Sequence, residues 1–289
     1  MFIGRFIQYL QFEKRYSPHT ISAYNKDLLQ FSEFIAQSQS DIHAVSHYDI
    51  RSWMVELMDQ KTDPKTINRK ISTLRSFYKF LMREQLIDKD PVIQIKGPKV
   101  GKRLPVIIEE DKINSLLDQF EFPDNFGGLR DKLVIELLYG TGMRLAELVS
   151  LKESGINRYE SNIRVLGKRS KERIIPLNKS LIKLLEQYCD EKNKLFDNEM
   201  LIVTDQGKKA YPKLVYRIVH YYLTKVSTQT KKSPHVLRHT FATGLLNNGA
   251  DLNAIKELLG HSSLAATQIY THNSVERLKA VYKQAHPKA

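Results

Sequence analysis

Through residues 1–95, hydrophobic residues recur every three or four positions, which is the period of amphipathic helices. The spacing predicts four helices. Their apolar faces are Phe2, Ile3, Phe6, Ile7 and Leu10; Ile21, Tyr24, Leu28, Phe31 and Ile35; Ile50, Trp53, Met54 and Leu57; and Ile67, Ile71, Leu74, Phe77, Tyr78 and Leu81. Ser17-Pro18 and Asp63-Pro64 mark two helix starts, each a capping residue followed by proline. We expect Asp90-Pro91 to close the fourth helix, because proline pushes the preceding residue out of helical geometry.

The rest of the chain mixes helices with two strands. Residues 96–105, KGPKVGKRLP, are expected to be an interdomain linker, because glycine, proline and basic residues fill them without periodicity. Residues 162–166 and 173–177 are expected to form a β-hairpin with the basic tip GKRSKE. Helices are expected over residues 109–120, 129–139, 145–151, 181–194, 213–226, 235–247, 252–259, 264–270 and 275–282, with Gly140-Thr141-Gly142 breaking the second.

These patterns predict a mainly α protein with a small β-hairpin or sheet in its second part. The helical domain is expected over residues 1–95 and the second domain over residues 106–289. No strand pattern is visible in the first of these.

Composition and charge narrow the class of protein. Of the 289 residues, 45 are Lys or Arg and 32 are Asp or Glu, so the formal net charge is +13 and polyanions are the expected partners. The apolar fraction of 42% excludes wholesale disorder. No run approaches the roughly 18 consecutive apolar residues that cross a bilayer, so no membrane partner is expected. The single cysteine, Cys189, fits a reducing cytoplasm.

Basic side chains also follow one face of the fourth helix. Arg75, Lys79 and Arg83 are spaced by four residues, and Lys65 and Arg69 lie near the start of the helix. Two interpretations stay open, a solvated face or a helix that contacts phosphates. In the second interpretation, the candidate DNA contacts are Lys65, Arg69, Arg75, Lys79, Lys102 and Arg103.

Four short patterns hold the side chains that phosphoryl transfer to a tyrosine needs. They are TGMRLAEL (141–148), GKRSKER (167–173), PHVLRH (234–239) and LGHSSLAATQIYTH (259–272). Arginine forks bind two phosphate oxygens, a lysine protonates the leaving oxygen, and a tyrosine attacks. The acidic clusters of two-metal nucleases are not evident, which counts against that class.

Each pattern also has a structural explanation when it is taken alone. Arg144 could form an exposed ion pair with Glu147 one turn away, which would contribute little. His235 and His239 have a zinc-like spacing, but Arg238 lies between them and no metal site is expected. Only the combination of all four patterns favours a catalytic site over these structural explanations.

In this order and at this spacing, the four patterns resemble the catalytic signature of the tyrosine recombinases, the phage-integrase family. The run SPHVLRHTFATGLLNNGADLNAIKELLGHSSLAATQIYTH is highly specific, and the ending VYKQAHPKA resembles the bacterial Xer subgroup, which resolves chromosome dimers. The resemblance covers the whole chain, because the family pairs a helical core-binding domain with a catalytic domain.

The resemblance implies an enzyme that cuts and rejoins double-stranded DNA at a specific recombination site through a 3′-phosphotyrosine. It implies no metal and no other cofactor. The implied assembly is a tetramer, formed with itself or with a second recombinase, and a septal DNA translocase is a further implied partner. Chromosome partition during cell division is the implied role.

The resemblance also assigns roles to single residues. Arg144 and Arg238 match the arginines that grip the phosphate, and Glu147 matches an acidic position that orients Arg144. His261 fills the position of a hydrogen-bond donor to the scissile phosphate. His235 matches the family's acid/base histidine.

The nucleophile and the general acid are assigned in the same way. Tyr270 matches the attacking tyrosine, and Lys168 matches the lysine on the hairpin that protonates the 5′-oxygen. Relatives commonly have glycine after this lysine, where this chain has Arg169, so Lys171 stays open as the alternative acid.

The C-terminal segment docks on a neighbouring protomer in relatives. In this chain it carries an apolar face suited to such a contact, formed by Val275, Leu278, Val281 and Tyr282.

Three rival interpretations share part of this pattern. A mobile-element integrase or invertase has the same motifs and a different target. A type IB topoisomerase relaxes supercoils without pairing two sites. A non-catalytic DNA-binding protein would form no covalent adduct with DNA.

Overall fold

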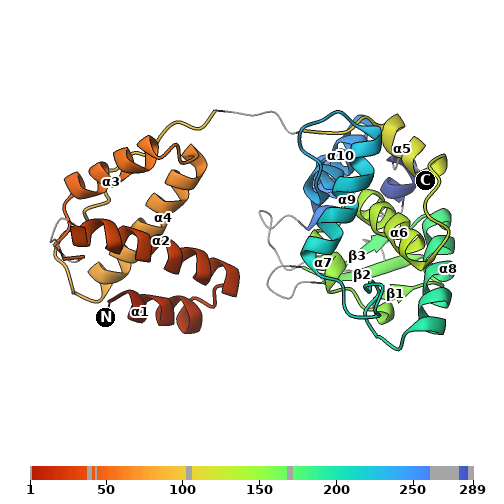
Figure 1. Ribbon diagram of the computed structural model, residues 1–289, viewed down its shortest axis with the longest axis horizontal. Coiled ribbons are helices and arrows are strands. Elements are labelled where there is room, and N and C mark those ends of the chain that lie inside the picture. Colours follow the sequence, from red (N-terminus) through yellow and green to blue (C-terminus); the bar gives the residue numbers. More distant parts are fainter. Residues whose placement is uncertain are drawn as a thin grey trace. The chain divides into compact units, whose positions relative to one another are not determined.

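The computed structural model describes residues 2–37, 41–42, 44–101, 106–167, 172–260 and 280–285. The chain divides into two compact units, Met1–Arg103 and Leu104–Ala289, which are described separately (Figure 1). Over the described residues, none of the helices is both long and apolar enough to span a membrane.

Unit 1 is helical throughout its described regular structure. Its elements are α1 (Phe2–Gln8), which continues as the π-helical turn η1 (Tyr9–Glu13), α2 (Pro18–Gln37), α3 (His47–Asp59) and α4 (Pro64–Arg83). The Asp63 carboxylate accepts from the Lys65 N–H and Pro64 follows in the first turn, as the sequence predicted for this start. α3 begins with a capping box, in which Ser46 and Asp49 satisfy each other's backbone N–H groups.

The core of unit 1 is built against α4. The rings of Phe31 from α2 and Trp53 from α3 pack with their centroids 4.8 Å apart. The Tyr78 hydroxyl of α4 donates to the carbonyl of Ile42 at 2.9 Å. Each apolar helical face predicted from the sequence supplies side chains to this cluster.

The predicted end of α4 is wrong. The helix ends at Arg83, where Gln85 takes the left-handed conformation with φ of 56° and the Leu86 N–H donates back to the carbonyl of Leu81. This tight reversal terminates the helix well before Asp90-Pro91. Pro91 instead lies in a turn that brings Val92 and Ile95 into the core.

The first residues of the expected linker pack on α4. Arg75 donates to the carbonyl of Ile95 at 2.6 Å, and the Asn68 amide donates to the carbonyl of Pro98 at 2.9 Å. A Cβ at Gly97 would lie 1.8 Å from the Asn68 Oδ1, so only glycine lets the backbone approach this closely. This segment is irregular, but it is anchored to unit 1.

A buried ionic cluster ties α2 to α4. The carboxylate of Asp27, 1% exposed, accepts from the Lys70 ammonium at 3.1 Å, from the Thr73 hydroxyl at 2.9 Å, and from Arg69. Lys70 also lies over the ring of Trp53, 5.5 Å from its centroid. A buried ion pair with all its partners in place is a strong constraint, because removal of one member leaves an uncompensated charge.

Unit 2 combines a set of helices with one small sheet. The helices are α5 (Glu110–Asp118), α6 (Phe126–Thr141), α7 (Leu145–Val149), α8 (Lys179–Leu195), α9 (Pro212–Val226), α10 (Pro234–Asn247) and α11 (Leu252–Leu259). The short 3₁₀ turn η2 (Glu153–Gly155) leads into strand β1 (Ile156–Asn157), followed by β2 (Asn162–Leu166) and β3 (Glu172–Pro176).

The sheet is antiparallel in the order β1-β2-β3. The predicted hairpin is β2–β3, in register with Val165 opposite Arg173 and Leu166 opposite Glu172. The two-residue β1 is too short to give an alternating pattern, and the sequence did not predict it. The mainly α fold with a small sheet is confirmed.

Helix α6 is the centre of unit 2 (Figure 1). It packs against α8, α9 and α10, and its residues from Leu133 to Thr141 are buried on every side. The helix continues through Gly140 and Thr141 and ends only at Gly142, whose φ of 58° closes it with a hydrogen bond to the carbonyl of Leu138. A Cβ at Gly142 would also lie 2.4 Å from the ring of Phe241. This turn therefore requires glycine both for its positive φ and for the space beside Phe241.

The C-terminal segment packs on the same unit. Residues 280–285 are helical, and Tyr282, 3% exposed, donates its hydroxyl to the carbonyl of Gly140 at 2.8 Å. The Asn248 amide donates to the carbonyl of Ala285 at 2.9 Å. The helix expected over residues 264–270 lies outside the described residues, as do Val275 and Leu278.

We expect Asp27→Asn to destabilise unit 1 by about 3 kcal/mol, because Lys70 then stays buried without a counter-charge. Trp53 is the only tryptophan in the chain and lies in this core, so its fluorescence during urea unfolding reports unit 1 selectively. Asp59→Asn, at the exposed end of α3, is the control and should leave the midpoint unchanged. Equal midpoints for the two variants would contradict the assigned role of the cluster.

Candidate active site

The turn after α6 places Arg144 and Glu147 together. Arg144 is extended and caps α7, and its backbone N–H donates to the Glu147 carboxylate at 2.7 Å. Its guanidinium donates to the same carboxylate at 2.8 Å and to the carbonyl of Gly260 at 3.0 Å. The side chain stays 34% exposed, so Arg144 is both oriented and accessible.

Glu147 is a buried carboxylate held by two arginines. Arg173 of β3 donates through both terminal nitrogens, 2.8 Å to each of the two carboxylate oxygens. Burial acts to raise the pKa of Glu147, but the hydrogen bonds and charges of Arg173 and Arg144 outweigh it and lower the pKa to about 2. The weak exposed ion pair that Arg144 and Glu147 could have formed is therefore not what the structure contains.

Arg238 lies on α10 and reaches the ends of two other helices. It donates to the carbonyl of Gly142 at 2.6 Å and to the carbonyl of Leu259 at 2.7 Å. Carbonyls at helix C-termini carry partial negative charge, which suits a cation. Burial and then the charges of Arg144 and Arg173 lower the pKa of Arg238 to about 10, so it stays protonated at neutral pH.

The cluster of Arg144, Arg173, Arg238 and Glu147, which we call the arginine site, has an excess of positive charge. Three guanidinium groups face one carboxylate and the dipoles of helix ends that hold them in place. A phosphodiester between Arg144 and Arg238 would meet donors in fork geometry and compensate the excess charge. The arrangement is suited to binding an anion.

The remaining candidate residues are placed as follows. His235 is in the first turn of α10, one turn before Arg238, and is exposed. Lys168, His261, Tyr270, Lys102 and Arg103 lie outside the described residues. The carbonyl of Gly260, the residue before His261 in the sequence, accepts from Arg144.

Arg173 is a site residue that the sequence did not single out. It lies within the pattern GKRSKER, but its expected place was the first residue of a strand. The signal that could have found it is its alternation with Ile175, which puts its side chain on the buried face of β3.

Comparisons with known proteins agree with this geometry. Residues 107–277 match the sequence profile of the phage integrase family, and residues 3–85 match the phage integrase N-terminal SAM-like domain. The chain is 37% identical to tyrosine recombinase XerD of Staphylococcus aureus, covering 99% of both chains. It is 35% identical to tyrosine recombinase XerC of Chlorobaculum parvum, covering 98% of this chain and 94% of the relative.

The chain belongs to the phage integrase family. Its expected enzyme class, a DNA strand-exchange recombinase, is confirmed by this membership.

Solved structures share the fold at lower identity. The XerH site-specific recombinase in its post-cleavage complex with a palindromic difH substrate gives a TM-score of 0.77 at 22% identity, over 96% of this chain and 93% of that chain. A lambda integrase tetramer bound to a Holliday junction gives a TM-score of 0.69 at 18% identity, over 92% of this chain and 74% of that chain.

The four predicted DNA contacts of unit 1 that the structure describes differ in their surroundings. Arg69 is bonded to Asp27 and Arg75 to the carbonyl of Ile95, so both have structural partners. Lys65 and Lys79 are exposed on α4, and neither has an ion-pair partner within the part of the chain that the structure describes. The latter two fit the phosphate-contacting interpretation better.

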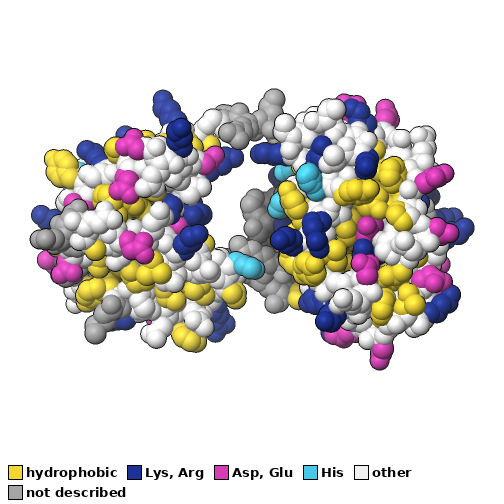
Figure 2. All heavy atoms as spheres, viewed as in Figure 1, with side chains coloured by type: hydrophobic (Ala, Val, Ile, Leu, Met, Phe, Trp, Pro, Cys, Tyr) yellow, Lys and Arg dark blue, Asp and Glu magenta, His cyan; other side chains and the backbone are white. Residues whose placement is uncertain are grey.

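A second basic surface of this recombinase was missed in the sequence. Figure 2 shows Lys, Arg and His side chains gathered with hydrophobic ones on the face of unit 2 where α9 and α10 lie. The exposed side of α9 consists of Lys213, Tyr216, Arg217, His220, Tyr221, Thr224 and Lys225. The sequence predicted a helix over residues 213–226 but singled out none of its basic side chains.

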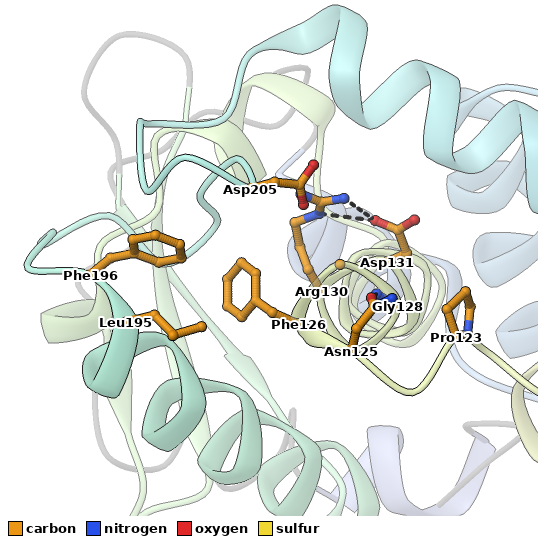
Figure 3. Close-up of a pocket in the computed structure, with 10 residues that line it drawn as sticks. Pro123, Asn125, Phe126, Gly128, Arg130, Asp131, Leu195, Phe196 and Asp205 are labelled. Atoms are coloured by element: carbon orange, nitrogen blue, oxygen red, sulfur yellow. Dashed lines mark hydrogen bonds and ion pairs between the residues drawn. The ribbon is translucent and has the colours of Figure 1, made fainter.

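A hollow of about 580 Å³ lies elsewhere on unit 2, between the start of α6 and the end of α8 (Figure 3). Arg130 points into it and donates to Asp131 at 2.8 Å and to Asp205 at 2.6 Å. Two carboxylates thus balance this arginine, so the hollow lacks the charge excess of the arginine site. Among the described residues, no group of His, Cys, Asp or Glu side chains is arranged to hold a metal ion.

The pKa of Glu147 predicts how acid destabilises unit 2. Its folded pKa of about 2 lies below the ordinary value of 4.5, so its contribution is complete above about pH 5 and is lost as the pH falls toward 2. The full contribution is about 3 kcal/mol. Glu147→Gln should therefore lose less stability between pH 6 and pH 2.5 than the wild type, as measured by urea unfolding followed by far-UV circular dichroism.

The exposed Glu199, paired with Lys152, provides the control. Glu199→Gln should follow the wild-type dependence on pH. A Glu147→Gln curve parallel to the wild type would show that the carboxylate is not held as described.

Proposed function

We propose that this recombinase cuts and rejoins DNA at a specific site through a 3′-phosphotyrosine, and that it resolves chromosome dimers at a terminus site during cell division. The observation that carries the proposal is the arginine site, where Arg144 and Arg238 converge with an excess of positive charge. The near full-length similarity to XerC and XerD favours the chromosomal role over that of a mobile-element integrase.

The arginines bind the scissile phosphate. In the transition state of the attack, a second negative charge develops on the phosphate oxygens, and preorganised guanidinium groups stabilise that charge more than the ground state. Because Arg238 is fixed by two helix ends and Arg144 by Glu147, little reorganisation is needed when the charge develops.

The other roles complete the reaction. Tyr270 attacks the phosphorus and forms the 3′-phosphotyrosyl bond, while the 5′-oxygen leaves with a proton from Lys168. His235 accepts the proton that the Tyr270 hydroxyl loses, and His261 donates a hydrogen bond to the phosphate. The exposed position of His235, one turn before Arg238, supports this role.

Cleavage exchanges the DNA phosphodiester for a phosphotyrosyl ester, so the energy of the broken bond is conserved in the new one. The reverse attack by a 5′-hydroxyl of a second strand is therefore nearly balanced, and rejoining requires no nucleotide hydrolysis. In this scheme the arginine site supplies the positive charge, and no metal or other cofactor takes part.

The DNA lies against basic surfaces of both units. In unit 1 we assign backbone contacts to Lys65 and Lys79, and, on the sequence alone, to Lys102 and Arg103. In unit 2 the exposed side of α9 offers Lys213, Arg217 and Lys225. Such contacts position a protein on DNA, and residues between them read the bases.

We propose a tetramer on two DNA sites, formed with itself or with a second recombinase. The lambda integrase tetramer on a Holliday junction, which shares this fold, supports the assembly. In the described chain, Tyr282 packs on its own unit, so docking of the C-terminal segment on a neighbour requires that contact to open. A septal DNA translocase is the activator we expect, and the cytoplasm is where we expect the enzyme to act.

The nucleophile is tested with a nicked suicide duplex from the chromosome-terminus region of the host. Tyr270→Phe removes only the hydroxyl, so the duplex should still bind while the covalent adduct, resolved on a denaturing gel, disappears. Tyr159→Phe, a fully exposed tyrosine of unit 2, should form as much adduct as the wild type. Undiminished adduct with Tyr270→Phe would refute the assignment.

The arginines are tested by substitutions that keep the charge. Arg144→Lys and Arg238→Lys lose the fork, so single-turnover cleavage should fall by about 100-fold or more while affinity for the duplex changes little. Arg164→Lys, on the exposed side of β2, is the control for both measurements. If affinity and cleavage fell together, these arginines would be general DNA contacts.

A further inference from the structure

We propose that Arg173 is a positioning residue of the reaction, which holds Glu147 and the end of α11 so that Arg144 and Arg238 face the same phosphate. The inference rests on the proposed function of the arginine site. No motif assigned a role to this residue, which is the most buried of the three arginines in the arginine site.

All three nitrogens of the Arg173 guanidinium are used within the protein. The two terminal nitrogens donate to the two oxygens of Glu147, and Nε donates to the carbonyl of Leu258 at 2.8 Å. The side chain is 4% exposed. Because its side chain is almost fully buried, Arg173 does not reach the DNA, and it acts through its neighbours.

These bonds join three segments that are distant in sequence. Arg173 belongs to β3, Glu147 to α7, and Leu258 to the last turn of α11. The next two carbonyls of that turn, those of Leu259 and Gly260, accept from Arg238 and Arg144. One guanidinium thus fixes both the carboxylate and the helix end on which the two phosphate-binding arginines depend.

The backbone of Gly260 passes close to Arg173. A Cβ at Gly260 would lie 3.2 Å from the Cδ and from a terminal nitrogen of Arg173, and the glycine has a φ of 64°. The turn after α11 is therefore fitted to this side chain, and the chain continues from it to His261.

An arginine is required at this position by geometry. A lysine ammonium is a point charge, which does not span both oxygens of a carboxylate and a carbonyl on its far side. Without the fork, Glu147 keeps only Arg144 as its partner, and the carbonyl of Leu258 loses its side-chain donor. Arg144 would then lose its fixed orientation, and small displacements of a catalytic group strongly reduce rates.

The experiment compares Arg173→Gln and Arg173→Lys with Arg164→Gln. Arg164 is the matched control, because it lies on the adjacent strand, is 64% exposed, and forms only a 3.8 Å contact with Glu172. On the suicide duplex, both Arg173 variants should cleave about 100-fold more slowly in a single turnover, with affinity changed by less than about 3-fold. Arg164→Gln should cleave like the wild type.

A double-mutant cycle separates positioning from general stability. Because Arg173 acts in part through Glu147, the loss of cleavage rate in the variant Glu147→Gln/Arg173→Gln should be well below the product of the losses in the two single variants. The proposal would be overturned if the loss in the double variant equalled the product of the losses in the two single variants. Cleavage at the wild-type rate by Arg173→Lys would also overturn it. Arg173→Lys keeps the buried charge, so it remains informative if Arg173→Gln fails to fold, which circular dichroism reports.

A substrate with sulfur in place of the leaving 5′-oxygen tests whether loss of Arg173 acts through the other arginines or through the general acid. A 5′-bridging phosphorothioate needs little protonation of its leaving group, so it rescues loss of the general acid Lys168. The sulfur substrate should not restore cleavage by Arg173→Gln, because this variant is defective in the positions of Arg144 and Arg238 and not in the general acid. Rescue by sulfur would overturn the route through Glu147, whereas a wild-type chain that forms no adduct would refute the proposed function and leave the geometry of Arg173 untouched.

Discussion

The carboxylate of Glu147 is the constraint on which the arrangement of unit 2 around its site depends. It accepts the backbone N–H of Arg144, the guanidinium of Arg144 and both arms of Arg173, all at 2.7–2.8 Å. A single anion therefore starts α7, orients the guanidinium of Arg144 and attaches the β-hairpin to the same point. Because the group is buried, its charge is maintained only while both arginines stay in place.

The backbone contributes as much to the site as the side chains. Two helices, α6 and α11, end in glycines with positive φ, Gly142 and Gly260, and their terminal carbonyls turn toward the arginines. Side-chain donors satisfy carbonyls that a helix end would otherwise leave without partners. The same contacts bring guanidinium groups together despite their mutual repulsion, which adds to the effect of burial in lowering the pKa of Arg238.

The fold class and most helices could be predicted, because periodic apolar positions and proline-marked starts are local signals. The end of α4 could not, since a left-handed Gln85 carries no such signal. In the site, motif spacing identified Arg144, Arg238 and Glu147 but not their burial. Arg173 was missed because its role follows from contacts with α7 and α11, which no spacing along β3 encodes.

The internal pairing of arginines bears on how DNA binding responds to ionic strength. The chain has 45 Lys and Arg residues, yet Arg69, Arg130, Arg173 and Lys192 each pair with a carboxylate of the same protein. Only exposed cations such as Lys65, Lys79 and Lys213 are placed to displace condensed counterions from a duplex. The slope of binding against salt concentration will therefore reflect this smaller set, and affinity will be less sensitive to salt than the number of basic residues suggests.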